Sequence, residues 1–236
     1  MAKEKKQGQE ADILTKIVGK IENFLITHLE KIIISIAICV ILLASFLIIN
    51  HVLGKKESIA ENAFGKVYLT YGLLSSDENL QEQEFKEKLL VLTESFKVVM
   101  EEYPKTKAAA KSAFYIGNIY FSTGEYEKAI EYFKKGTEIT GQKYYAVLLC
   151  YLGEATTYEQ LGNYEKSEEI YRHILESYKN SFVIPTVKFN LGQLYEKMNK
   201  IDEAREQYDG IVSKYEWSSW SELAKKRLLM LKTRHS

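Results

Sequence analysis

The sequence predicts an all-α protein in which a single N-terminal transmembrane helix is followed by a right-handed α-solenoid of stacked helix pairs. Three observations predict this class. A charge-free apolar run occupies residues 32–53, similar segments recur at a nearly constant spacing in the second half of the chain, and only two prolines occur in 236 residues. Because proline breaks helices, its scarcity favours long helices over a fold with many turns.

Charge and cysteine content narrow the possible functions. The chain has 32 basic and 32 acidic side chains and no net formal charge, so no overall field attracts it to nucleic acid. Of its two cysteines, Cys39 lies inside the apolar run and Cys150 lies far from it. We therefore expect no intramolecular disulfide and no nucleic-acid partner.

The apolar run is long enough to cross a membrane. Its 22 residues, from Ile32 to Leu53, contain no charged side chain, and a helix needs about 20 apolar residues to cross the hydrocarbon core. A buried core helix is an alternative. A cleaved signal peptide fits poorly, because 31 residues precede the run and no small-residue cleavage pattern follows it. We interpret the run as an uncleaved signal anchor.

The segment before the run, residues 1–31, predicts an amphipathic helix over residues 10–31. This helix could lie on the membrane surface, pair with a partner helix or only orient the anchor. Six lysines precede the run and three follow it closely, which favours a cytoplasmic N-terminus. The C-terminal part then faces outward, which is the periplasm if the cell is a double-membraned bacterium. The apolar positions of the amphipathic pattern are Ile13, Ile17, Val18, Ile21, Phe24, Leu25 and Leu29.

Three segments of the second half share one pattern. The stretches GEYEKAIEYF, GNYEKSEEIY and NKIDEAREQY begin at Gly124, Gly162 and Asn199, and an apolar helix pattern precedes each. Glycine and asparagine tolerate the left-handed backbone with which one helix ends before the next begins. Each unit therefore predicts a pair of helices, and periods of this length are typical of helical solenoids.

These units resemble the tetratricopeptide repeat, in which small residues let two helices approach and aromatic rings fill the remaining space. Glu154 stands where the second unit should have a large apolar residue, and Asn199 and Ile201 replace the turn glycine and an aromatic in the third. We expect Gly117 and Gly192 at close helix crossings. The matching residues are Ile116, Gly117, Tyr120, Gly124, Tyr126, Ala129 and Phe133 in the first unit, Ala155, Tyr158, Gly162, Tyr164, Ser167 and Tyr171 in the second, and Leu191, Gly192, Tyr195, Ala204 and Tyr208 in the third.

The period is longer than the usual repeat of about 34 residues. The extra residues open each unit with an aromatic, a polar turn and a helix, as in EEYPKTKAAAKSAF and ESYKNSFVIPTVKF. This variant is similar to the repeats of bacterial envelope proteins such as BamD and CpoB. The expected domains are an N-terminal segment (1–31), the span (32–53), a degenerate first helix pair with a polar insertion (54–104), three repeats (105–218) and a capping helix with a polar outer face (219–236).

The layout as a whole resembles the YfgM-like family of ancillary subunits of the SecYEG translocon. The resemblance rests on the N-terminal span, the helix IAENAFGKVYLTY from Ile59 to Tyr71 and the repeats that follow. It implies a single-pass protein of the bacterial inner membrane with periplasmic repeats. The implied partners are translocon subunits, periplasmic chaperones or exported clients.

The sequence offers little for catalysis. Only His173, of four histidines, lies within the repeats, and no metal-binding cysteine spacing, phosphate-binding glycine loop or nucleophile motif occurs. We expect no enzyme activity, no cofactor, no metal and no small-molecule substrate.

Protein binding is the expected function, through the concave surface that the first helices of stacked pairs form. Phenylalanines with interspersed amides suit an extended or helical peptide. A clamp for a C-terminal carboxylate is not expected, because Phe114 occupies a place where such clamps have lysine. The ten residues expected in the groove are Lys111, Phe114, Asn118, Phe121, Leu152, Thr156, Glu159, Phe189, Gln193 and Glu196.

The sequence thus predicts a membrane-anchored scaffold or adaptor in protein export or envelope assembly. Two alternatives stay open at this point. One is a structural envelope protein that self-associates, and the other is a receptor whose repeats face the cytosol.

Overall fold

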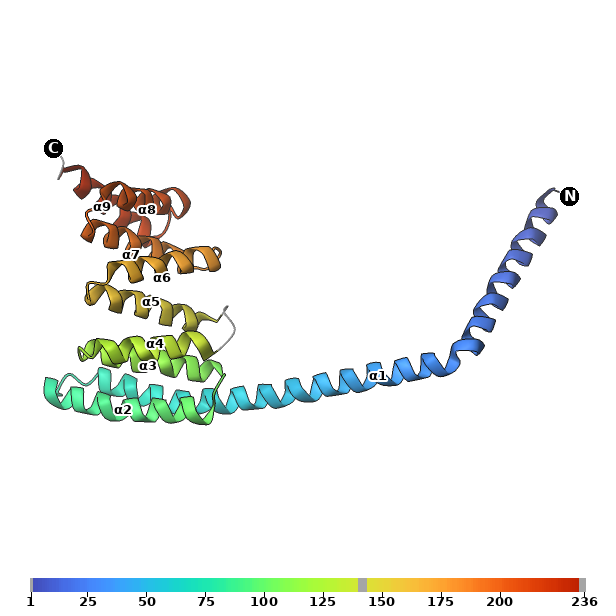
Figure 1. The fold of residues 1–236 in the computed structure, drawn as a ribbon, viewed down its shortest axis with the longest axis horizontal. Helices are drawn as coiled ribbons and strands as arrows, with labels where there is room; N and C mark the ends of the chain where they lie inside the picture. The colour runs from blue at the N-terminus through green and yellow to red at the C-terminus, as the bar shows by residue number, and fades with distance from the viewer. Residues whose placement is uncertain (1, 140–143, 234–236) are drawn as a thin grey trace. The chain divides into compact units, whose positions relative to one another are not determined.

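The structure is a computed structural model that describes residues 2–139 and 144–233, with side chains from Thr15 onward except at positions 25 and 32. Every regular element in this part of the chain is an α-helix (Figure 1). The chain divides into two compact units, residues 1–55 and residues 56–236. The helices are α1 (Ala2–Ser75), α2 (Glu82–Glu102), α3 (Lys107–Ser122), α4 (Tyr126–Ile139), α5 (Tyr145–Gln160), α6 (Tyr164–Ser177), α7 (Ile184–Lys197), α8 (Ile201–Lys214) and α9 (Ser219–Thr233).

The first unit is the N-terminal part of α1. Its described side chains between Ile33 and Leu53 are all exposed, for example Leu42 at 64%. Within the described residues this is the one helix that length and composition would allow to cross a membrane, with a mean hydropathy of 3.3 in its most apolar window. Two positions of the predicted amphipathic pattern, Ile13 and Leu25, lie outside the described side chains.

The second unit is an α-solenoid of helix pairs (Figure 1). The predicted turn residues have the expected left-handed backbone, with φ of 83° at Gly124, 73° at Gly162 and 58° at Asn199. Each lies between the two helices of a pair, α3 and α4, α5 and α6, or α7 and α8. The prediction of two helices per unit is therefore confirmed.

The polar turns that open the units work as helix caps. Thr106 Oγ1 accepts a hydrogen bond from the Ala109 backbone N–H at 3.1 Å, and Ser218 Oγ accepts one from Ser221 at 3.2 Å. Both hydroxyls lie three residues after an aromatic, Tyr103 or Tyr215, in the repeated pattern. A side-chain acceptor at this place satisfies an N–H that has no partner within the helix, which sets where α3 and α9 begin.

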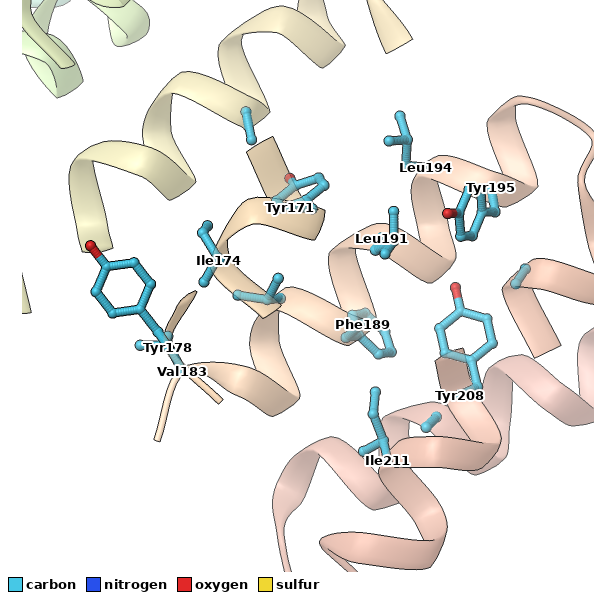
Figure 2. Close-up of a cluster of buried hydrophobic side chains, with 14 of the residues drawn as sticks. Tyr171, Ile174, Tyr178, Val183, Phe189, Leu191, Leu194, Tyr195, Tyr208 and Ile211 are labelled. Atoms are coloured by element: carbon cyan, nitrogen blue, oxygen red, sulfur yellow. The ribbon is translucent and has the colours of Figure 1, made fainter. Parts of the chain in front are cut away.

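Two clusters of buried apolar side chains hold the solenoid together. One joins residues 56–75 of α1 to α2, α3 and α4, with Phe96 and Phe133 at 0% and 1% exposure. The other joins the helices from α5 to α9 and contains three fully buried tyrosines, Tyr171, Tyr195 and Tyr208 (Figure 2). The aromatic positions of the repeat pattern thus fill the space between helices, as the sequence predicts.

The final helix differs from expectation. Residues 219–233 of the predicted cap form α9, and residues 234–236 lie outside the described part. Its exposed side chains include Leu223, Leu229 and Met230 as well as lysines. The outer face is therefore mixed rather than polar, because these apolar side chains point away from both α8 and α7, the helices that α9 contacts.

Glu154, which departs from the repeat pattern, is buried at 6% exposure in α5. Its carboxylate lies 3.8 Å from Lys134 Nζ. Burial raises the pKa of Glu154 above its usual value, and Lys134 offsets part of that increase. The predicted register of α5 therefore holds with a carboxyl group in an apolar position.

We expect Glu154→Gln to stabilise the protein at neutral pH. Because the folded-state pKa is raised, the folded protein favours the protonated carboxyl. The contribution of Glu154 to the free energy of unfolding is therefore most favourable below pH about 4.5, and it is lost as the pH rises through the folded-state pKa. The stability difference between variant and native protein should therefore grow from pH 4 to pH 8 in chemical unfolding. Glu206→Gln removes an exposed carboxylate as the matched control. A pH-independent difference would contradict the prediction.

Candidate functional site: a groove along the first helices of the repeats

The first helices of successive pairs run side by side in the same direction. Glu57 Oε1 accepts a hydrogen bond from the Lys107 backbone N–H at 2.9 Å, and Glu61 Oε2 lies 2.7 Å from Lys111 Nζ. Each contact joins residues fifty positions apart, so this part of α1 and α3 are parallel. These helices, α1, α3, α5, α7 and α9, form one face of the solenoid, which we call the groove.

Ion pairs join most neighbouring helices of the groove. Lys197 Nζ lies 2.7 Å from Glu159 Oε1 between α7 and α5. Arg227 of α9 donates two hydrogen bonds to the Glu196 carboxylate of α7, at 2.9 and 2.6 Å. In the described part of the chain no ion pair joins α3 to α5, and an apolar pocket lies there instead.

The apolar pocket has a volume of about 250 Å³. Five of the ten residues expected in the groove line it, all of them partly exposed, from α3 and α5. Aromatic and aliphatic walls with an amide and a hydroxyl at the side are typical of a site that takes an apolar side chain and pairs with the backbone beside it. The lining residues are Phe114, Asn118, Phe121, Phe133, Leu149, Leu152, Gly153 and Thr156.

Phe133 of α4 forms the floor of this apolar pocket. Its ring lies against both Gly117 of α3 and Gly153 of α5. A Cβ atom on Gly117 would stand 2.5 Å from the ring carbon Cε1, closer than atoms in contact can approach. The two glycines therefore make room for the ring, and the predicted close crossing at Gly117 is confirmed. At Gly192 a Cβ would stand 2.6 Å from the Tyr208 ring, which confirms the second.

A second, polar pocket of about 240 Å³ lies between α5, α7 and α9. Its lining residues are Glu159, Gln193, Glu196, Lys197 and Arg227, and its charges are paired as described. The hydrogen bond with Glu196 raises the pKa of Arg227, so the guanidinium stays charged. Glu196 also accepts a hydrogen bond from Tyr208 Oη at 2.6 Å. A partner in this pocket could contact the Gln193 amide and the partly exposed side chains of the Lys197–Glu159 and Arg227–Glu196 ion pairs.

Two of the ten predicted residues lie elsewhere. Lys111 is held by Glu61 and its ammonium lies 5.2 Å from the centre of the Phe64 ring. Phe189 is only 8% exposed, and its ring centre lies 5.5 Å from that of Tyr208 (Figure 2). The Trp220 ring covers it as well, with its centre 5.3 Å away. The Phe189 side chain therefore has little surface to offer a partner.

The other eight predicted residues lie in the two pockets, and their role in binding stays a prediction. The sequence reasoning missed Leu149, Gly153, Lys197 and Arg227. Helical spacing could have found Leu149, which lies three residues before Leu152 on the same face of α5. No signal in the sequence places Arg227 of the last helix beside Glu196.

Among the described residues, no group of three or more histidine, cysteine, aspartate or glutamate side chains could hold a metal ion. Cys150 is fully buried against the Ala110 carbonyl, and burial raises the pKa of its thiol, which keeps it protonated and unreactive.

Comparison with known proteins agrees with this geometry. Two family models described as tetratricopeptide repeat match residues 108–180 and 187–216. Both matched segments therefore have the pattern of the tetratricopeptide repeat. Repeats of this kind are generally non-enzymatic and act as scaffolds that bind proteins, so protein partners are expected.

One solved structure shares the fold at a TM-score above 0.5, and two others match with lower scores. A tetratricopeptide repeat protein from Parabacteroides merdae has a TM-score of 0.54 and 19% identity, over 74% of this chain and 60% of its own length. A thermophilic tetratricopeptide repeat protein from Thermus thermophilus has a TM-score of 0.49 and 18% identity, over 72% of this chain and 99% of its own. MamA has a TM-score of 0.41 and 17% identity, over 57% and 74%. No curated protein matches the chain significantly.

Proposed function

We propose that the protein is a membrane-anchored scaffold that holds a protein partner in its groove, at the inner membrane of a bacterium. The observation that carries the binding part is the apolar pocket between α3 and α5, where five partly exposed side chains line a preformed cavity. An apolar anchor of the partner would fill this pocket. Its backbone would meet Asn118 and Thr156 at the rim.

The membrane and export parts of the proposal rest on the sequence. The apolar run of 22 residues would serve as the anchor, and the excess of lysines before it would keep the N-terminus in the cytoplasm. The repeats would then work in the periplasm. A role in protein export or envelope assembly follows from the resemblance of this layout to the ancillary translocon subunits.

The test is cross-linking of the tagged full-length chain in intact bacteria, with a reagent that does not cross the inner membrane. We expect a protein to be captured by the native chain and lost with Leu152→Lys, which puts a charge in the apolar pocket, and with Phe114→Ala, which removes one wall. Leu161→Lys is the matched control, because Leu161 is also partly exposed but lies in a turn outside the pocket.

Each part of the proposal fails in its own way. Capture that persists in both pocket variants would contradict the groove assignment. Capture that requires a membrane-permeant reagent would place the repeats in the cytosol and contradict the export role, while leaving groove binding intact.

A further inference from the structure

The solenoid has two unlike edges. On one edge lie the short turns within the pairs, at residues 123–125, 161–163 and 198–200. On the other lie the longer connections from one pair to the next, at residues 103–106, 178–183 and 215–218, which with Tyr145 at the start of α5 we call the loop edge. Because neighbouring helices alternate in direction, these connections all fall on the same side of the stack (Figure 1).

Large aromatic side chains project from the loop edge. Trp217 is 96% exposed and Phe182 is 72% exposed. The Phe182 ring lies 5.1 Å from that of Tyr145, itself 46% exposed. In the three turns of the opposite edge, Leu161 at 43% is the single large apolar side chain with comparable exposure among the described residues, and the end of α1 on that edge adds another aliphatic side chain, Leu73 at 65%. Exposed tryptophan and phenylalanine gathered on one edge indicate a surface that is not fully in water.

The loop edge is also where the chain enters the second unit. Glu57 accepts its hydrogen bond from Lys107 N–H at the start of α3, directly after the connection 103–106. Glu57 lies four residues after Leu53, where the apolar run ends, which is about 6 Å along a helix. If the run crosses a bilayer, this corner of the loop edge lies at the level of the lipid headgroups.

We propose that the loop edge rests on the membrane surface, with Phe182 and Trp217 in the headgroup region. This inference depends on the membrane anchoring proposed above. Tryptophan is enriched at that depth because its ring is apolar and its N–H can still reach water. The charged residues of the three connections are Lys105, Lys179 and Glu216, and the adjoining helix ends carry both signs. The aromatic side chains therefore provide the contact, and charge contributes little.

A folded protein partner is the competing occupant of the same aromatic side chains. The covalent connection favours lipid, because Glu57 at one corner of the edge is only four residues from the last residue of the apolar run, whereas the groove pockets lie on the faces of α3, α5, α7 and α9. If this edge contacts the bilayer, the helices of the solenoid lie perpendicular to the membrane plane rather than along it, and the groove stays accessible to a partner.

Fluorescence tests the proposal, because the chain has only two tryptophans, Trp217 and Trp220. Trp220→Phe leaves Trp217 as the sole indole. We use the full chain in vesicles of phosphatidylcholine and phosphatidylglycerol, with bromine on the phosphatidylcholine acyl chains just below the headgroup. We expect Trp217 emission to fall in proportion to the brominated lipid and to lie at shorter wavelength than emission from an indole in water.

Two controls use a background in which both tryptophans are replaced by phenylalanine. Leu161→Trp reports the opposite edge and should not be quenched. Phe46→Trp reports the apolar run and should be strongly quenched if the run lies in the bilayer. Should Trp220→Phe unfold the chain, as far-ultraviolet circular dichroism would show, the difference between native protein and Trp217→Phe gives the same Trp217 signal. The two controls are then made in the Trp217→Phe background, and the Trp220 signal of that background is subtracted.

The outcomes separate the two proposals. Quenching of Phe46→Trp without quenching of Trp217 overturns the membrane contact of the loop edge and leaves the anchor standing. Absence of quenching in Phe46→Trp overturns the anchor, and the loop-edge proposal with it. Equal quenching of Trp217 and Leu161→Trp would show contact without a preferred edge, which also overturns the proposal.

Discussion

A Gly117→Ala chain is expected to be less stable than the native protein by about 1 to 3 kcal/mol, the usual cost of overpacking a core. The new Cβ would stand 2.5 Å from the Phe133 ring, which is 1% exposed and also lies against Gly153. Because the same ring atoms are close to both glycines, the ring has little room to move aside. The measurement is the shift of the thermal midpoint in detergent micelles, followed by circular dichroism.

The sign of this effect distinguishes packing from helix propensity. Alanine normally stabilises a helix interior relative to glycine by roughly 0.5 to 1 kcal/mol. Gly65→Ala provides the matched control, since a Cβ at that position of α1 would point into open space, with no packed neighbour within 4 Å. We expect that variant to gain stability. In a Phe133→Leu background, Gly117→Ala should reduce the stability by less than it does in the native protein. An equal loss of stability in both backgrounds would show that the ring is not its cause.

Arg227→Met is expected to destabilise the C-terminal half of the solenoid by roughly 2 to 3 kcal/mol, somewhat less than for a fully buried pair. The Glu196 side chain is 8% exposed, and Arg227, which is 33% exposed, donates two hydrogen bonds to it. Without the guanidinium, a carboxylate remains in a poorly hydrated place with only Tyr208 Oη as donor. Chemical unfolding measured by circular dichroism gives the loss.

A second substitution checks that the unpaired charge causes this loss. Glu196→Gln added to Arg227→Met removes the charge and keeps an acceptor for Tyr208, so it should recover part of the stability. Lys225→Met removes the ion pair with Glu222, whose side chains are 47% and 66% exposed, and should change little. No recovery in the double variant would mean that Arg227 acts by packing alone.

Much of the solenoid is predictable because its determinants are local. The backbone at Gly124, Gly162 and Asn199 depends on residues that accept a positive φ, and the caps at Thr106 and Ser218 depend on hydroxyls next to a helix start. These requirements repeat with the period of the fold, so each unit supports the interpretation of the next.

The candidate site is less predictable, because a helix pattern identifies a face but not the neighbour that covers it. Phe114 and Phe189 occupy similar places in their repeats, yet Phe114 lines a pocket whereas Phe189 is covered by Trp220. Lys111 looks like a groove cation in sequence, but Glu61, fifty residues earlier, pairs with it. Such coverage depends on residues far away in the chain.

By itself the sequence determined the helices, their pairing, the turns and the apolar run, since each depends on spacing within one unit and on the backbone preferences of single residues. Only the tertiary structure decided which groove positions stay open, where the Phe133 ring lies between two glycines, and which edge exposes Trp217. The physical reason is that exposure and pairing are set by the side chains of the adjacent repeat, which local periodicity does not specify.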